Sequence, residues 1–192
     1  MQPLALAVAA ATALWLTMRS WYTGVHFPIE RPRITQEFGA ITPPWYSSAN
    51  PHRGVDMSPW AGAHGARIEA PLSGKVIDTG EHTYAGTYVI LQASVPYKFG
   101  ASDRYGNYHE VPANAKLFFR LTHFQELRVS KGQRVRKAQL LGLLGNTGKY
   151  SSGPHLHLEL WAHEYGGNGL LLDPMHFFVS FIVGLKQQIE VV

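Results

Sequence analysis

The chain has 192 residues, a length that favours one domain with short appendages at most. It contains no cysteine, which excludes disulfides and thiolate zinc sites, so any metal ion must be held by His or carboxylate groups. The net charge of +4, counted with neutral His, suits an anionic polymer. No nucleic-acid-binding motif accompanies that charge, and we therefore expect no nucleic acid as a partner.

The N-terminal segment, residues 1–23, is apolar and rich in Ala, and it predicts a helix. A signal peptide would begin with a basic residue and end at a small-residue cleavage site, and neither is evident here. A membrane anchor needs roughly 20 apolar residues, more than this weakly hydrophobic run provides. The third alternative is a helix that docks onto a partner or onto the domain itself. We therefore separate residues 1–23, an anchor or docking segment, from a single domain over residues 24–192.

Short segments rich in β-branched and aromatic residues follow from Ile34 onward, and Gly, Pro and Asn separate them. This pattern is typical of antiparallel strands joined by turns, so we expect a mostly β fold. Residues 94–114 form a long, polar, Tyr-rich insertion between two strands, which we expect to be a loop. Near the end of the chain, Asp173 as a cap and Pro174 in the first turn predict a short C-terminal helix.

Two histidines, His155 and His157, lie in the segment SGPHLHLEL. Residues two apart on a strand point to the same side, so both imidazoles would project from one face. Leu156, Leu158 and Leu160 would then enter the core from the opposite face. A surface strand with two chance histidines would give the same pattern.

The segment HRGVD places His52 and Asp56 four residues apart. In an extended strand they would be separated by roughly 13 Å, whereas zinc ligands lie about 2 Å from the metal. The chain must bend if both bind one metal ion, and Gly54 would permit the bend. A solvated polar turn is the alternative. Combined with the His155/His157 pair, the segment completes the ligand set of a catalytic zinc site, which has three protein ligands and one open position.

The order of these motifs resembles the LytM/lysostaphin-type zinc endopeptidases. The resemblance is specific, because two short His motifs and a third His fall in the family's order over roughly residues 33–178. It implies an antiparallel β peptidase domain with one Zn²⁺ ion. The matching segments are ITQEFGA (34–40), HRGVDMS (52–58), APLSGKVIDTG (70–80), LTHF (121–124), VSKGQRVRKAQLLGLLGNTG (129–148), SSGPHLHLELW (151–161) and LDPMHFF (172–178).

The resemblance also implies a role for each site residue. The implied zinc ligands are His52, Asp56 and His157, and the implied catalytic residues are His155, His123 and, by a looser match, Tyr46. The remaining histidines lack a partner at ligand spacing, and we expect surface or packing roles for them.

Two further positions bear on the site. Glu159 would either orient a zinc ligand from behind or be a charge on the strand surface. The family pattern has Tyr two residues before the catalytic His, where this chain has Leu121, and this departure would alter a wall of the groove.

The activity implied by the resemblance is hydrolysis of peptide crosslinks or stems of bacterial peptidoglycan, outside the cytoplasm, at the cell envelope or on a virion. The alternative is a LytM-like structural component of a larger assembly such as a phage tail, with little or no turnover. Residues 1–22 would attach the chain to that assembly or to a membrane. The structural alternative predicts missing ligands, and the sequence lacks none. Whether a glycine bridge or a D-amino-acid crosslink is cut depends on the shape of the groove.

Overall fold

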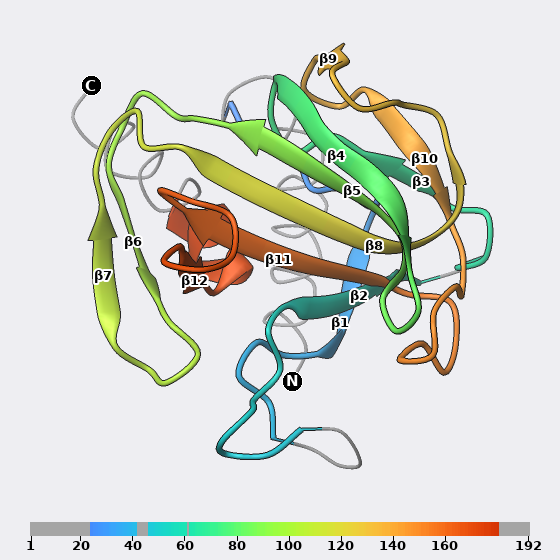
Figure 1. Cartoon of the computed structure of the whole chain (residues 1–192), viewed down its shortest axis with the longest axis horizontal. Coiled ribbons are helices and arrows are strands. Elements are labelled where there is room, and N and C mark those ends of the chain that lie inside the picture. The colour runs from blue at the N-terminus through green and yellow to red at the C-terminus, as the bar shows by residue number, and fades with distance from the viewer. Residues whose placement is uncertain (1–23, 42–45, 61, 181–192) are drawn as a thin grey trace, which may run out of the picture.

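The computed structural model describes residues 24–41, 46–60 and 62–180. Their fold is mostly antiparallel β, as the sequence predicts, and residues 174–180 are helical (Figure 1). The helix expected over residues 1–23 lies outside the described residues. The strands are β1 (Pro32–Gln36), β2 (Val55–Pro59), β3 (Arg67–Glu69), β4 (Gly74–His82), β5 (Gly86–Ala93), β6 (Phe99–Ser102), β7 (Tyr108–Val111), β8 (Leu117–Leu127), β9 (Arg134–Val135), β10 (Leu140–Leu144), β11 (Leu156–Ala162) and β12 (Leu170–Leu172).

A single 10-stranded sheet organises the described part of the chain, with the order β1-β2-β11-β8-β5-β4-β9 along its main path. β10 pairs with β3 and β8, and β12 pairs with β11. The long strand β8 lies between β5 and β11 and pairs with both in antiparallel fashion. In the part of the chain that the structure covers, no helix is long and apolar enough to span a bilayer.

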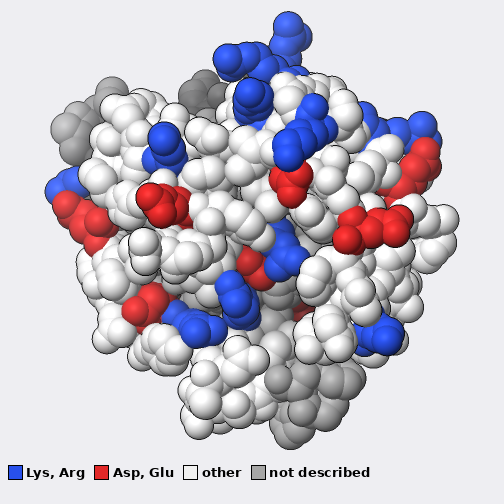
Figure 2. Space-filling model, viewed as in Figure 1, with Lys and Arg blue, Asp and Glu red and all other residues white. Residues whose placement is uncertain are grey.

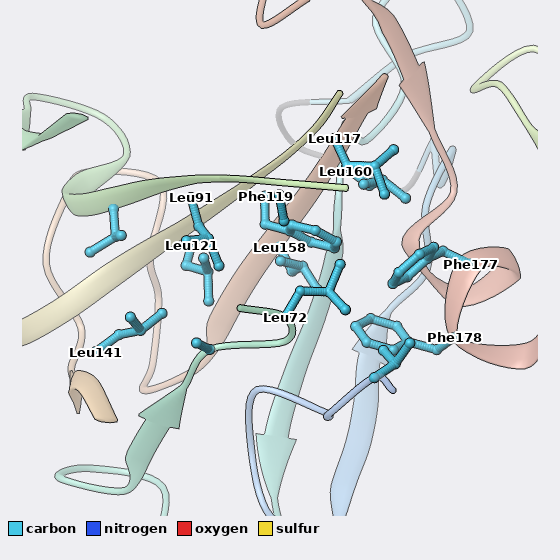
Figure 3. Packing of buried hydrophobic residues seen from close by; sticks show 14 of the residues in the cluster. Leu72, Leu91, Leu117, Phe119, Leu121, Leu141, Leu158, Leu160, Phe177 and Phe178 are labelled. Carbon is cyan, nitrogen blue, oxygen red and sulfur yellow. The ribbon is translucent and has the colours of Figure 1, made fainter. Parts of the chain in front are cut away.

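Alternation along β8 and β11 gives the sheet two different faces. Leu158 lies opposite Leu121 and Leu160 opposite Phe119, and all four are fully buried in the core (Figure 3). Burial of each such side chain contributes about 1.5–3 kcal/mol to stability. The intervening residues of β11 therefore point away from the core. The predicted inward orientation of the leucines is confirmed, and Leu121 belongs to the core rather than to a wall of the groove.

The C-terminal helix covers the other side of this core. The Met175 backbone N–H donates to Asp173 Oδ1 at 2.8 Å, which is the predicted cap. Phe177 and Phe178 are buried beneath the sheet (Figure 3). The ring centroids of Phe178 and Phe27 are 4.3 Å apart. The helix thus closes the core with aromatic side chains.

The insertion at residues 94–114 is not the loop expected from the sequence. It contains the β6–β7 hairpin, which projects at the side of the sheet (Figure 1). Asp103 organises the turn, since its carboxylate accepts backbone N–H groups of Tyr105 and Asn107 at 2.9 and 3.0 Å. The Asp173 N–H, which follows β12, donates to Ser102 at 2.9 Å. The polar, Tyr-rich composition hid the strands, because both are short and the Asp103 turn residues dominate the segment.

Candidate metal centre and active site

Three ligand atoms converge where β2 and β11 lie side by side, His157 being the register partner of Asp56. His52 Nε2 lies 3.2 Å from Asp56 Oδ1 and 3.0 Å from His157 Nδ1, and the latter two atoms are 2.8 Å apart. Four ligands about 2 Å from a zinc ion at tetrahedral angles are separated by about 3.3 Å. The three side chains could therefore bind one metal ion.

Gly54 accounts for the close approach of these two chain segments. The chain bends at Gly54 before β2 begins, as the sequence predicts. A Cβ at this position would lie 2.7 Å from His157 Cε1 and 2.5 Å from the Leu158 carbonyl oxygen. Glycine is therefore required here for space, because any side chain would push strand β11 and His157 away.

A β-bulge in β8 directs the His123 side chain towards the three candidate metal ligands. Thr122 pairs with Tyr88 and Phe124 with Thr87, so His123 has no partner on β5. His123 has a φ of 67°, in the left-handed region that non-glycine residues rarely adopt. Strict alternation would point it into the core beside Leu121, and the extra residue turns it to the site face instead.

The bulge is held by Thr147, which follows β10. Its side chain accepts the Thr87 N–H at 3.0 Å and donates to the Phe124 carbonyl at 2.9 Å. Its own carbonyl accepts the His123 Nδ1 proton at 2.7 Å. This bond leaves His123 Nε2 without the ring proton, and Nε2 is thus available as a base.

His155 precedes β11 and lies beside His123, their ring centroids being 4.6 Å apart and their planes tilted by 52°. Its Nδ1 donates to the Gly153 carbonyl at 2.7 Å, and its Nε2 lies 3.6 Å from Asp56 Oδ2. Two imidazoles therefore border the three-ligand cluster without being part of it.

The comparisons with known proteins agree with this arrangement. The model of "Peptidase family M23" matches residues 93–174, a stretch that includes His123, His155 and His157. Residues 93–174 belong to peptidase family M23, the LytM/lysostaphin type. The peptidoglycan DD-endopeptidase ShyA of Vibrio cholerae is 36% identical over 110 residues, and lysostaphin of Staphylococcus simulans is 28% identical over 116 residues. These matches cover 57% and 60% of this chain, but only 20% of each relative's length.

Solved structures show the same fold. The catalytic domain of lysostaphin from Staphylococcus simulans has a TM-score of 0.58 at 22% identity, covering 88% of this chain and 98% of that domain. A zinc-containing peptidase from Vibrio cholerae has a TM-score of 0.53 at 27% identity, covering 71% of this chain and 36% of the other. The described domain therefore has the LytM/lysostaphin fold.

Behind the ligands of this M23 domain lies Glu159, which is only 2% exposed. Its carboxylate is 3.4 Å from His157 Nε2 and accepts hydrogen bonds from Arg120 at 3.0 Å and Trp161 Nε1 at 2.8 Å. Of the two sequence alternatives, a charge on the strand surface is therefore wrong. His52 is supported similarly, because its Nδ1 donates to the Glu37 carbonyl at 2.8 Å.

The electrostatics of the M23 site favour a bound cation. Burial alone would raise the pKa of Asp56, but hydrogen bonds from His157 and His52 outweigh it and hold that pKa well below its usual range. Burial would likewise lower the pKa of His157, but Asp56 and Glu159 raise it to about 9. The ligands thus attract positive charge even without metal.

The pKa of His123 is shifted in the opposite direction to that of His157. Burial and the neighbouring imidazole of His155 lower the pKa of His123 to about 4, despite its bond to Thr147. The ring is therefore neutral at physiological pH, as a proton acceptor must be.

Tyr46 lies beside the metal cluster, its ring centroid 4.7 Å from that of His52. Burial, followed by the negative charge of Asp56, raises the pKa of its phenol, so it stays protonated and can donate a hydrogen bond. The structure thus brings together all six residues singled out in the sequence.

The remaining described histidines lie outside the M23 site. His109, on the hairpin, bonds to Asp103 at 3.0 Å, and His26 bonds to Glu69 at 2.7 Å. Sequence reasoning missed Thr147, whose role depends on a strand distant in sequence. The NTG turn after β10 was visible in the sequence, but nothing in it pointed to His123.

Proposed function

We propose that this domain is a zinc-dependent endopeptidase that hydrolyses peptide crosslinks or stems of bacterial peptidoglycan. The observation that carries the proposal is the convergence of His52, Asp56 and His157, with two further imidazoles beside them. The donor set of two His and one carboxylate is typical of catalytic zinc, and it leaves one position open. When bound, zinc would supply a Lewis acid that acidifies water and polarises the scissile carbonyl.

The chain's own residues supply the proton chemistry. Neutral His123, with Nδ1 bonded to Thr147, accepts a proton from the attacking water at Nε2. His155 lies beside it and, as an imidazolium with protons on both ring nitrogens, donates from Nε2 to the charge that develops on the carbonyl oxygen. The proton that His123 accepted then passes to the leaving amine. Tyr46 donates a hydrogen bond to the same developing charge.

The substrate class rests on the relatives. Two of them are named peptidoglycan DD-endopeptidases, and one, from Staphylococcus capitis, is named a glycyl-glycine endopeptidase. The chain spans a fifth of the length of the first two. Such a substrate implies action outside the cytoplasm, at the cell envelope or on a virion. Attachment to a membrane, a phage tail or another assembly would involve residues 1–22.

The structural alternative without turnover is not favoured, because it expects an incomplete site. All three ligands are present and lie within metal-binding distance of one another.

Metal analysis combined with mass spectrometry of released wall fragments tests the proposal. The full chain should contain one zinc per molecule and release peptides from purified peptidoglycan. His157→Ala should lose both zinc and activity, whereas His123→Ala should keep zinc and lose activity. His64→Ala, an exposed His outside the site, serves as the matched control. Wall cleavage that persists in His123→Ala, or a folded wild type without zinc, would overturn it.

A further inference from the structure

A cavity of about 390 Å³ lies between the β6–β7 hairpin, β11 and β12. Its lining includes Arg53, Arg104, Tyr105 and Trp161. Figure 2 shows Lys or Arg side chains around a hollow near the centre of this face, with acidic side chains beside them. A volume in this range can hold a small ligand group or an amino-acid side chain.

Both arginines are positioned by aromatic rings rather than by acids. Arg53 Cζ lies 5.2 Å from the centre of the Trp161 ring, and Arg104 Cζ lies 5.0 Å from that of Tyr105. Among the residues that the structure describes, neither guanidinium forms an ion pair with a carboxylate. A guanidinium stacked on a ring keeps its N–H groups free for bidentate bonding.

The acidic residue in the lining, Asp103, is already engaged within the hairpin. Oδ1 accepts the backbone N–H groups of Tyr105 and Asn107, and Oδ2 accepts bonds from the Asn107 side chain at 2.9 Å and from His109 at 3.0 Å. Its carboxylate therefore cannot also satisfy the two arginines. With two arginines and one carboxylate in its lining, the cavity has a net positive charge beside an aromatic wall.

The cavity lies along the strand that carries the metal site. Arg53 directly follows the ligand His52 in the chain. Trp161 shares the face of β11 with His157 four residues earlier, which corresponds to roughly 13 Å. A short extended peptide held at the metal centre would reach this distance.

We propose that this cavity is a substrate subsite in which Arg53 and Arg104 bind a free carboxylate of the peptide. This subsite rests on the proposed function and adds the kind of peptide that the site prefers. The preferred substrate is an acidic stem peptide, rather than an uncharged oligoglycine bridge, because the bridge has only neutral carbonyl acceptors and no carboxylate for a bidentate, charge-assisted bond to an arginine. One of the two arginines, Arg104, comes from the turn of the β6–β7 hairpin, so the hairpin contributes directly to substrate preference.

Two matched substrates test the subsite. One is a soluble crosslinked stem-peptide dimer with free carboxylates, and the other is the same dimer with those groups converted to carboxamides. The zinc-loaded full chain should cleave the acid form with a kcat/KM higher by about tenfold or more, mainly through KM. Arg53→Gln and Arg104→Gln should each reduce this preference, and the double variant should lose it. Arg134→Gln, an exposed arginine on the distant strand β9, should retain it.

Binding measurements separate this proposal from the catalytic one. Calorimetry with His123→Ala should show about tenfold or more tighter binding of the acid dimer than of the amide, and the double arginine variant in that background should bind both equally. If neither dimer is cleaved by the wild type, the proposed function fails, while the calorimetry still decides the subsite. Equal affinity for acid and amide in the presence of both arginines, or a preference that survives their replacement, overturns the subsite.

Discussion

At the residue scale, the site depends on buried groups that contact the proposed metal ligands from behind. Glu159 contacts His157 on the side away from the other ligands, and it is in turn fixed by Arg120 and Trp161. A carboxylate in this place increases the basicity of the imidazole and fixes its ring orientation. The paired arginine makes burial of the carboxylate tolerable.

Glu159→Gln keeps the shape of the side chain but removes its charge. We expect zinc affinity to fall by about 10- to 100-fold, because His157 loses its anionic partner. Competition with a chromophoric chelator measures this directly. Glu126→Gln, which alters an exposed acid paired with Arg128, should leave the affinity unchanged. Equal zinc affinity in wild type and Glu159→Gln would show that the contact does not tune the metal site.

At the element scale, two irregular segments determine what the regular strands present. The bulge in β8 places His123, and the β6–β7 hairpin places Arg104. Both are stabilised by single side chains, Thr147 and Asp103, that bond several backbone groups at once. Each can therefore be tested by a change that leaves the strands themselves intact.

Thr147→Val removes the hydroxyl that links β5 to the bulge. The Thr87 N–H then loses its partner, which should destabilise the fold by about 1–3 kcal/mol. Displacement of His123 should lower kcat on the order of tenfold or more while zinc content stays constant. Urea unfolding and steady-state kinetics measure the two effects, with Thr79→Val on β4 as the control. An unchanged kcat would mean that the bulge keeps His123 in place without Thr147.

Asp103 makes hairpin stability depend on pH. Burial would raise the pKa of Asp103, but its hydrogen bonds, first that of His109, lower it to about 2. A depressed pKa means that its stabilisation is fully present above the ordinary value near 4 and is lost as pH falls towards 2. Asp103→Asn should therefore lower the urea midpoint at pH 7, and the difference from wild type should shrink below pH 4. A constant difference across that range would contradict this assignment.

At the scale of the whole molecule, the sequence predicts the framework better than the irregularities. The alternation of Leu156, Leu158 and Leu160 correctly assigned the core face, and the HRGVD motif correctly located the bend at Gly54. Local alternation could not place His123, whose role only the family resemblance implied, because strict alternation from Leu121 points that side chain into the core. The bulge arises from a contact with Thr147, 24 residues away, which local periodicity does not encode.

The hairpin at residues 94–114 escaped prediction for a related reason. Its turn is stabilised by Asp103 bonds to Tyr105 and Asn107, and its base is tied to β12. Such tertiary anchoring overrides the weak propensity of two short strands.

Metal binding should stabilise the whole domain, because the proposed ligands come from β11, from β2 and from the chain leading into β2. A zinc concentration of about 100 times Kd contributes about 2.7 kcal/mol, which for a domain of this size raises Tm by about 5–10 °C. Differential scanning calorimetry with zinc and with excess chelator measures the shift. His157→Ala should show no shift, and a shift of equal size in that variant would place the stabilising metal elsewhere.

The bulge in β8 also keeps His123, the proposed proton acceptor, outside the regular pairing of β8 with β5. If His123 were deleted, Phe124 would take the place that alternation reserves for the core, and the ladder with β5 would run without interruption. The pairing of β8 with β5 therefore does not require this residue, whose left-handed backbone costs about 1 kcal/mol or more. Outside that pairing, its carbonyl accepts the Gly145 N–H at 2.9 Å. The domain carries its proposed proton-transfer group on one inserted residue, so a single deletion would give a descendant that keeps the β5 ladder and lacks hydrolytic activity.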